Sequence, residues 1–126
     1  MSSSIKLRFV LLVYVLLVIV TSLLPSYGVP STWPIDKVIH FLVYAGMAVL
    51  ALFSFDAGPA RLVALVAAVG LGALLEWGQS FVPGRDMSWL DELVNALGVA
   101  VGAVIFRFYE RVLRPRLSML MEKRSD

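Results

Sequence analysis

The sequence predicts an all-α integral membrane protein, a four-helix bundle built from a single domain that covers residues 1–126. The first indication is composition: 60% of the residues are hydrophobic and the mean hydropathy is +0.86, whereas soluble domains are only about half apolar. The second is length, because four apolar stretches each approach the ~20 residues needed to cross ~30 Å of hydrocarbon. The chain has no cysteine, which excludes disulfides and thiolate metal sites.

The first span is predicted at residues 9–24. Lys6 and Arg8 precede this apolar run, and Pro25 ends it. A cleaved signal peptide is the alternative, but a signal core has roughly 7–15 residues and is followed by a small-residue cleavage site. This run is slightly longer and lacks an Ala-x-Ala pattern, so we expect an uncleaved span.

The second and third spans are predicted at residues 35–55 and 60–82. Pro34 precedes the second, and proline is well tolerated at a helix start. The turn-forming segment 56–59 separates the two spans, and Pro83-Gly84 ends the third. We therefore expect two antiparallel neighbours joined by a short turn.

The fourth span is predicted at residues 89–108. The sequence Ser88-Trp89-Leu90-Asp91 suits a capping box, in which Ser88 caps the helix and Asp91 reaches back. Residues 109–126 are expected to form a cytoplasmic tail with a short amphipathic helix at the membrane surface. Its basic residues are attracted to anionic headgroups, so membrane lipids are the expected partners.

The distribution of basic residues predicts that both termini are cytoplasmic, because cytoplasmic segments near spans are rich in Lys and Arg. The loops at residues 27–36 and 83–90 then face outward. Trp33 and Trp89 flank these loops and Trp77 lies about one turn below, as in an interfacial aromatic belt. Topology thus accounts for the basic residues, and nucleic-acid binding is not expected. On the terminal side lie nine of the 11 basic residues, Lys6, Arg8, Arg61, Arg107, Arg111, Arg114, Arg116, Lys123 and Arg124, and on the outer side only Lys37 and Arg85.

Polar side chains occur as pairs near the outer ends of three consecutive spans. Within each pair the residues are three or four positions apart, so they share one helix face. Short loops bring these helices together, which predicts an outward-facing polar pocket. The inner halves of the spans are almost wholly apolar, so no channel path is expected. The pairs are Asp36 and His40, Glu76 and Gln79, and Asp91 and Asn95.

Ionisable residues within membrane spans are functional candidates, since a charge there costs roughly 2.5 kcal/mol or more unless it is neutral, paired or hydrated. Glu76, His40 and Asp91 are the candidates for acid–base catalysis. Gln79 and Asn95 suit neutral ligand groups, and Arg85 in the outer loop suits phosphate or carboxylate. The predicted ligand-binding set is Asp36, His40, Glu76, Gln79, Arg85 and Asn95.

Each of these residues also has a structural interpretation. Glu76 could hydrogen-bond His40 or Asn95 across helices, Asp91 could serve only as a capping residue, and Arg85 could pair with Asp86 or Asp91. A zinc site made by His40, Glu76 and Asp91 would need converging ligands and a supporting second shell. One histidine is a weak indication of such a site, so we expect no metal and no other cofactor.

Over residues 33–106 the chain resembles the VanZ-like family, which is named for a protein associated with resistance to the glycopeptide antibiotic teicoplanin. The resemblance implies a small multi-span protein of the bacterial cytoplasmic membrane that is connected with the cell envelope. It rests on Asp36-Lys37-Val38-Ile39-His40-Phe41 with Tyr44, on Glu76-Trp77-Gly78-Gln79, on Pro83-Gly84-Arg85-Asp86, and on Asp91-Glu92-Leu93-Val94-Asn95 followed by Gly98 and Gly102.

Three classes of function are open at this point. The first is a binding protein whose outer pocket holds or modulates an envelope component, such as a lipid-linked precursor or a glycopeptide-related ligand, with an effect on teicoplanin susceptibility. The second is a membrane enzyme that uses Glu76 and His40 in acid–base chemistry on a lipid-like substrate. The third is a structural or assembly protein. We favour the first; the sequence leaves the oligomeric state undetermined.

Overall fold

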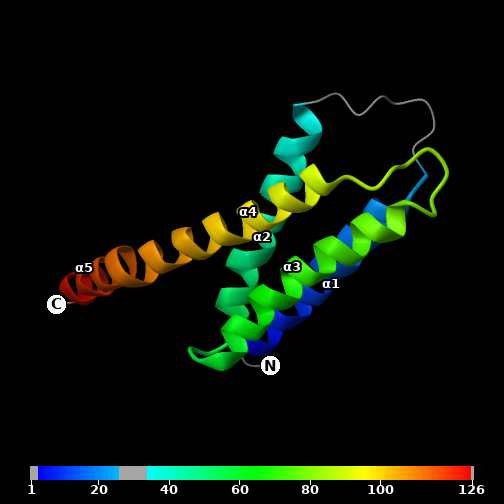
Figure 1. Cartoon of the computed structure of the whole chain (residues 1–126). Helices are drawn as coiled ribbons and strands as arrows, with labels where there is room; N and C mark the ends of the chain where they lie inside the picture. Colours follow the sequence, from blue (N-terminus) through cyan, green and yellow to red (C-terminus); the bar gives the residue numbers. More distant parts are fainter. Residues whose placement is uncertain (1–2, 26–33, 126) are drawn as a thin grey trace.

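The computed structural model describes residues 3–25 and 34–125, and within these ranges it contains helices and no strands (Figure 1). Four helices are long and apolar enough to cross a membrane, which confirms the predicted fold class. The elements are α1 (Ser3–Leu23), α2 (Ile35–Ser54), α3 (Pro59–Gln79), α4 (Trp89–Phe108), a π-helical turn (Tyr109–Leu113) and α5 (Arg114–Ser125).

The bundle has two chemically different ends. The polar end contains the start of α2, the start of α4 and the loop that joins α3 to α4 (Figure 1). The basic end contains the start of α1, with Lys6 and Arg8, and the turn between α2 and α3, followed by Arg61. Trp77 and Trp89 are 58% and 73% exposed, as a lipid-facing aromatic belt requires. Trp33 lies outside the described residues.

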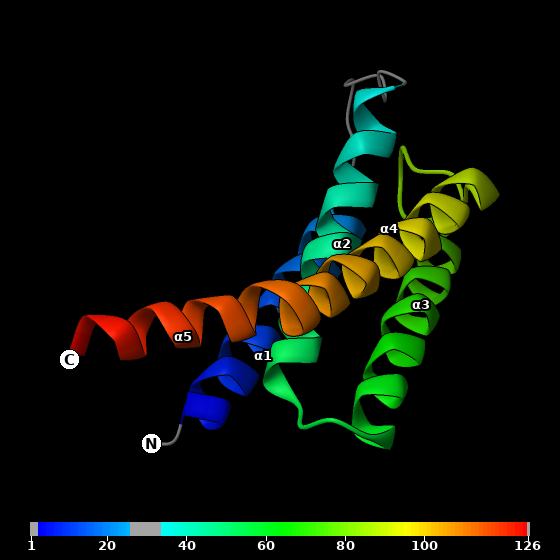
Figure 2. The same cartoon turned by 90° about the vertical axis from the view of Figure 1, so that its left-hand side faces the viewer.

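The closest helix packing is between α2 and α4, which cross near the middle of the molecule (Figure 2). Gly98 and Gly102 make this approach possible, because a Cβ atom at either position would lie 2.5 Å from a backbone oxygen of α2. In lipid the hydrophobic effect does not drive helices together, and small residues instead let two backbones approach closely enough for van der Waals packing to hold them. The predicted Gly-xxx-Gly face is therefore the contact between the second and fourth spans.

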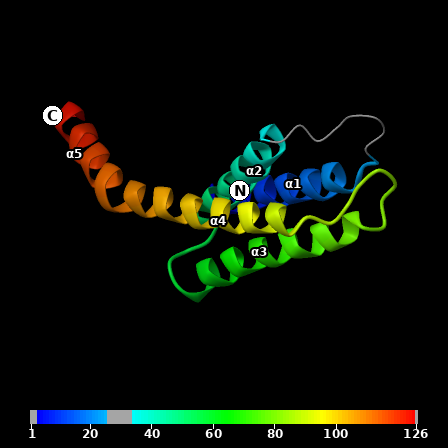
Figure 3. The same ribbon diagram turned by 45° about the horizontal axis from the view of Figure 1, so that its top comes forward.

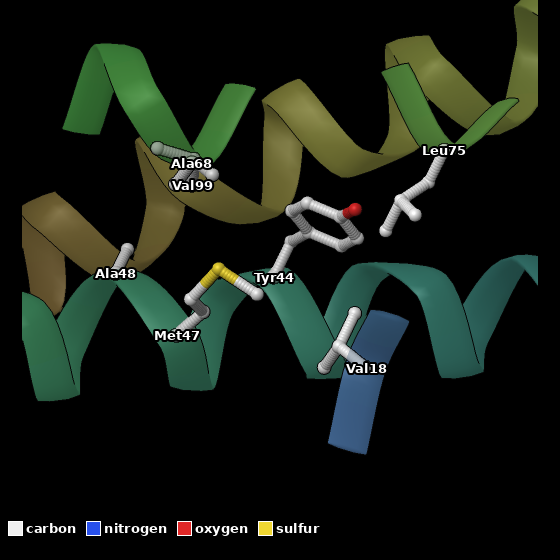
Figure 4. Packing of buried hydrophobic residues seen from close by; sticks show 7 residues of the cluster. All are labelled: Val18, Tyr44, Met47, Ala48, Ala68, Leu75 and Val99. Atoms are coloured by element: carbon white, nitrogen blue, oxygen red, sulfur yellow. The ribbon is translucent and has the colours of Figure 1, made fainter. Parts of the chain in front are cut away.

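The apolar core is assembled around α2. Tyr44 and Met47 project from this helix toward α3 and α4, and Val18 of α1 lies near them in the same cluster (Figure 4). On the α1 side, the Tyr14 hydroxyl donates a hydrogen bond to the carbonyl oxygen of Val43 at 2.9 Å. The cluster consists of Val18, Tyr44, Met47, Ala48, Ala68, Leu75 and Val99.

Two predicted span boundaries need correction. α1 begins at Ser3, so the helix includes Lys6 and Arg8, whose long side chains can reach the interface from a helix end. α3 ends at Gln79 rather than residue 82. The last turn tightens into hydrogen bonds between residues three apart, from Ser80 through Val82, because a residue that precedes a proline disfavours helical backbone angles.

The C-terminal tail is a helix, as predicted. α4 continues through the π-helical turn into α5, and the helix bends between the α4 and α5 labels (Figure 3); Pro115 lies in the first turn of α5. Leu117, Leu120 and Met121 are exposed and, at spacings of three and four residues, share one face of the helix, whereas Met119 lies on the opposite side. The location of this helix at the membrane surface stays a prediction.

Arg61 joins three elements at the basic end. Its Nη1 atom donates to both carboxylate oxygens of Glu110, at 3.0 and 3.1 Å, and its Nε atom donates to the carbonyl oxygen of Phe55 at 3.0 Å. The guanidinium carbon lies 4.7 Å from the centre of the Phe106 ring. α3 is thereby tied to the end of α2 and to the end of α4.

We expect Arg61→Ala to lower the free energy of unfolding by about 1–2 kcal/mol, through loss of the ion pair with Glu110 and of a cation–π contact. Arg61→Lys should recover only part of this, since an ammonium cannot reproduce the planar fork. Thermal unfolding in detergent measures both. Arg116→Ala, on exposed α5, is the matched control, and an Arg61→Lys protein as stable as wild type would contradict the prediction.

Candidate functional site

A polar cavity of about 250 Å³ lies at the polar end of the bundle. The starts of α2 and α4 and the loop after α3 form its walls. A second hollow, of about 280 Å³, adjoins it on the α1 side and shares Asp36, His40, Gln79 and Arg85. The first cavity is lined by Asp36, Lys37, His40, Gln79, Gly84, Arg85, Asp86, Met87, Ser88 and Asp91.

Lys37 is the central cation of the cavity. Its ammonium group makes a short contact with Asp91 Oδ1 and lies 3.4 Å from Asp36 Oδ2. Asp91 is buried, and a buried charge is tolerated when an opposite charge and hydrogen bonds accompany it. Lys37 therefore connects α2 to α4 by an ion pair, and its charge is already balanced by two carboxylates.

His40 stands between carboxylates and an amide. Its Nδ1 atom lies 3.0 Å from Asn95 Oδ1 and 3.7 Å from Glu76 Oε1, while its Nε2 atom lies 3.9 Å from Asp36 Oδ1. Asn95 is an acceptor at this oxygen, so the short contact requires a proton on Nδ1. The arrangement leaves Nε2 facing Asp36 and the cavity.

Glu76 completes the cap of α4 from a different helix. Ser88 caps α4 as predicted, since its Oγ accepts a hydrogen bond from the Asp91 amide at 3.2 Å. The reciprocal half of the box differs: the Ser88 amide donates to Glu76 Oε2 at 3.3 Å. The expectation that Asp91 reaches back is therefore wrong, because its carboxylate is held by Lys37 and a carboxylate on α3 takes the free amide instead.

Gln79 and Arg85 both bind the end of α1. Gln79 Nε2 donates to the carbonyl oxygen of Ser22 at 3.2 Å. Arg85 Nε donates to the carbonyl oxygen of Leu24 at 3.0 Å, and its Nη2 to that of Thr21 at 3.4 Å. The final carbonyls of a helix have no intrahelical partner. Arg85 satisfies them rather than pairing with an aspartate as the structural interpretation expected.

Glu92 is a further acidic residue, which the sequence analysis did not single out. Its Oε2 atom is buried and has no hydrogen-bond partner among the described residues. A Cβ atom at Gly72 would lie 2.6 Å from this oxygen and 3.2 Å from Asn95 Nδ2. Glu92 therefore lies beneath the cavity, against α3. Glu92 lies three residues before Asn95 and so fits the pairing pattern too, but the sequence analysis paired Asn95 with Asp91.

The sequence-predicted residues thus occupy two levels. Asp36, His40, Gln79 and Arg85, together with Asp91, line the cavity. Glu76 and Asn95 are each only 1% exposed and lie below, where they support His40 and the cap of α4.

One group of side chains in the described residues has the spacing of metal ligands. Oxygen and nitrogen atoms of Asp36, His40 and Asp91 lie within 4.8 Å of one another. The ammonium of Lys37 already contacts both carboxylates, so a divalent cation would have to displace it or lie beside a positive charge. The donor set does not fit a metal centre.

The family described as VanZ/LLP1 matches residues 4–110 of this chain. No curated protein and no solved structure shows significant similarity to it. The match extends from the first helix to the π-helical turn, and it covers every residue of the polar cavity and of the level beneath it.

Proposed function

Because the chain belongs to the VanZ/LLP1 family, we propose that it is a binding protein of the bacterial cytoplasmic membrane whose polar cavity holds the headgroup of a cell-envelope component. The observation that carries this proposal is the cavity itself, a polar hollow that the ends of three helices enclose above the apolar core of the bundle. A headgroup in this position would keep its lipid tail in the surrounding bilayer. A lipid-linked precursor of the cell wall fits this description, and its capture would alter teicoplanin susceptibility.

The contacts that the charged side chains of the cavity already make within the protein indicate which chemical groups a ligand should have. Lys37 is neutralised by two carboxylates, whereas Arg85 uses two of its five N–H groups on backbone carbonyls of the α1 end and keeps its charge. The Asp36 side chain is 30% exposed and that of His40 is 16% exposed, so these two groups keep hydrogen-bonding capacity toward the cavity. Hydroxyl, amide and amino groups suit them better than an isolated phosphate does, which favours a saccharide or peptide headgroup.

A membrane-embedded enzyme is the second candidate function. It is favoured by the row of titratable groups in which His40 stands between Asp36 and Glu76, at 3.9 and 3.7 Å. A histidine oriented by a carboxylate is the usual arrangement of a general base. In this case Asn95 would orient His40 through its contact with Nδ1, Glu76 at 3.7 Å would stabilise the protonated ring by its charge, and the reacting group would lie in the cavity at Nε2.

The experiment is to produce wild type and four variants in a glycopeptide-sensitive bacterial host, and to measure teicoplanin susceptibility together with the amount of each protein in the membrane. The variants are Asp36→Asn, His40→Ala, Arg85→Ala and Glu76→Gln. We expect wild type to shift susceptibility, and Asp36→Asn and His40→Ala to abolish the shift at unchanged abundance. Asp56→Asn, which removes an exposed carboxylate at the basic end, is the matched control.

Glu76 distinguishes the three classes of function. Glu76→Gln keeps an oxygen for the Ser88 amide and removes only the charge, whereas Glu76→Ala also leaves that amide without a partner. A binding protein should tolerate Glu76→Gln, and an enzyme should lose activity at full abundance. If every variant loses function only in proportion to its abundance, the cluster is structural. A wild-type protein without effect would contradict the link to teicoplanin.

A further inference from the structure

A further hollow, separate from the two at the polar end, lies on the flank of the bundle, and only apolar side chains line it. This lateral groove, of about 570 Å³, is formed by α1, α2 and α3. Met47 and Ala51 of α2 form its floor and are buried, whereas Val63 and Ala67 on its α3 wall are exposed. The groove is therefore open along the side that faces the bilayer.

The groove exists because α3 presents short side chains where it would otherwise meet α1. Ala60, Ala64, Ala67 and Ala68 line it from α3, and a methyl group cannot fill the space between diverging helices. In Figure 2, α1 and α3 lie on either side of the lower half of α2. An unfilled apolar space of this kind in a membrane is filled by the surrounding lipid.

The length of the groove matches one leaflet. Its α3 wall extends from Ala60 to Leu71, which at a rise of 1.5 Å per residue is roughly 17 Å. Half of a hydrocarbon core of ~30 Å is about 15 Å. A single acyl chain that enters from the leaflet at the basic end would therefore follow the groove to its end near the middle of the membrane.

A cation lies at the mouth of the groove. Phe55 lines the groove at the basic end, and the Arg8 guanidinium carbon lies 5.3 Å from the centre of its ring. Arg8 Nε donates to the carbonyl oxygen of Ser54 at 3.1 Å. Arg8 also shares a helix face with Leu11 and Val15, three and seven residues later, which line the groove.

The guanidinium of Arg8 retains most of its donors. Of its five N–H groups, one is used by Ser54, and within residues 3–25 and 34–125 no carboxylate forms an ion pair with it. A charged group directly above an apolar groove complements a molecule with an acyl chain and an anionic headgroup.

We propose that the lateral groove is a specific binding site for an anionic phospholipid, with one acyl chain in the groove and the phosphate against Arg8. This site is separate from the polar cavity, since the two share no residue. It would tie the loosely packed α1 to α2 and α3 through a bound lipid.

The test uses the full chain reconstituted in phosphatidylcholine nanodiscs that contain a phosphatidylglycerol with a photoactivatable group in its acyl chain. Cross-linked peptides are identified by mass spectrometry, and a phosphatidylcholine probe with the same chain provides the comparison. We expect the phosphatidylglycerol probe to label the groove, and Ala67→Phe to reduce this labelling to background by filling the space. Arg8→Gln should lower the preference for phosphatidylglycerol by about fivefold, the contribution typical of one basic residue near an anionic surface.

Two matched controls separate the groove from the general lipid surface. Val66→Phe adds the same bulk on the neighbouring lipid-facing position, which is exposed and outside the groove, and Arg116→Gln removes a charge from α5. Neither should change the labelling. Equal labelling by the two probes, unchanged labelling in Ala67→Phe, or cross-links that join two protein copies through the groove would overturn the proposal.

Discussion

Replacing Lys37 with methionine is expected to destabilise the protein by about 3–5 kcal/mol, the usual cost of removing one partner from a buried ion pair. The ammonium group is the shared partner of Asp36 and Asp91. Asp91 is only 7% exposed, so without Lys37 its charge would be left with little solvation at the junction of α2 and α4. The loss should appear as a lower unfolding temperature in detergent and as reduced abundance in the membrane.

A double-mutant cycle tests the cause of this effect. If the unpaired carboxylate is responsible, Asp91→Asn should restore much of the stability that Lys37→Met removes, because the two residues interact directly. Lys6→Met, which removes an exposed lysine at the opposite end of the bundle, should be nearly neutral. Additive losses in the double variant would mean that the ion pair does not account for the effect.

Gly98→Ala and Gly102→Ala are each expected to cost about 3 kcal/mol, the upper part of the range for overpacked cores. The new Cβ atom would lie 2.5 Å from the carbonyl oxygen of Phe41 in the first case and of Ala45 in the second. These neighbours are backbone atoms, so no side chain can rotate away. α4 would have to move from α2, which would also separate His40 from Asn95.

Gly70→Ala is the matched control. Gly70 lies in α3, and nothing lies within 4 Å of its Cβ position. Alanine is favoured over glycine by about 1 kcal/mol in a helix interior, so this substitution should be neutral or slightly stabilising. Unfolding in detergent provides the comparison of all three variants, and equal stabilities for Gly98→Ala and Gly70→Ala would contradict the close contact.

The pairing of the polar residues could be inferred from the sequence, and so could part of the cavity lining, whereas Glu76 and Asn95 lie beneath the cavity and Lys37 was not in the predicted ligand-binding set. Asp36 and His40 share a face because they are four residues apart, and the same spacing places Asp91 above Asn95. The partner of each residue could not be inferred. Glu76 was expected to hydrogen-bond His40 or Asn95, but its hydrogen bond is to the Ser88 amide, and Arg85 binds carbonyls of α1. Helical periodicity determines the face of a residue, whereas its partner depends on how neighbouring helices rotate and cross.

The sequence by itself determined the number of spans and their approximate limits, because the ~30 Å hydrocarbon core selects for apolar runs of fixed length. It also determined which helix could be approached closely, since Gly98 and Gly102 lack side chains. Only the tertiary structure decided that α2 is the helix that packs against these glycines. It also decided that Lys37 balances the carboxylates of the cavity and that the alanines of α3 leave a groove beside α1. These features depend on distances between residues far apart in the chain, which are set by the packing of whole helices and not by any local pattern.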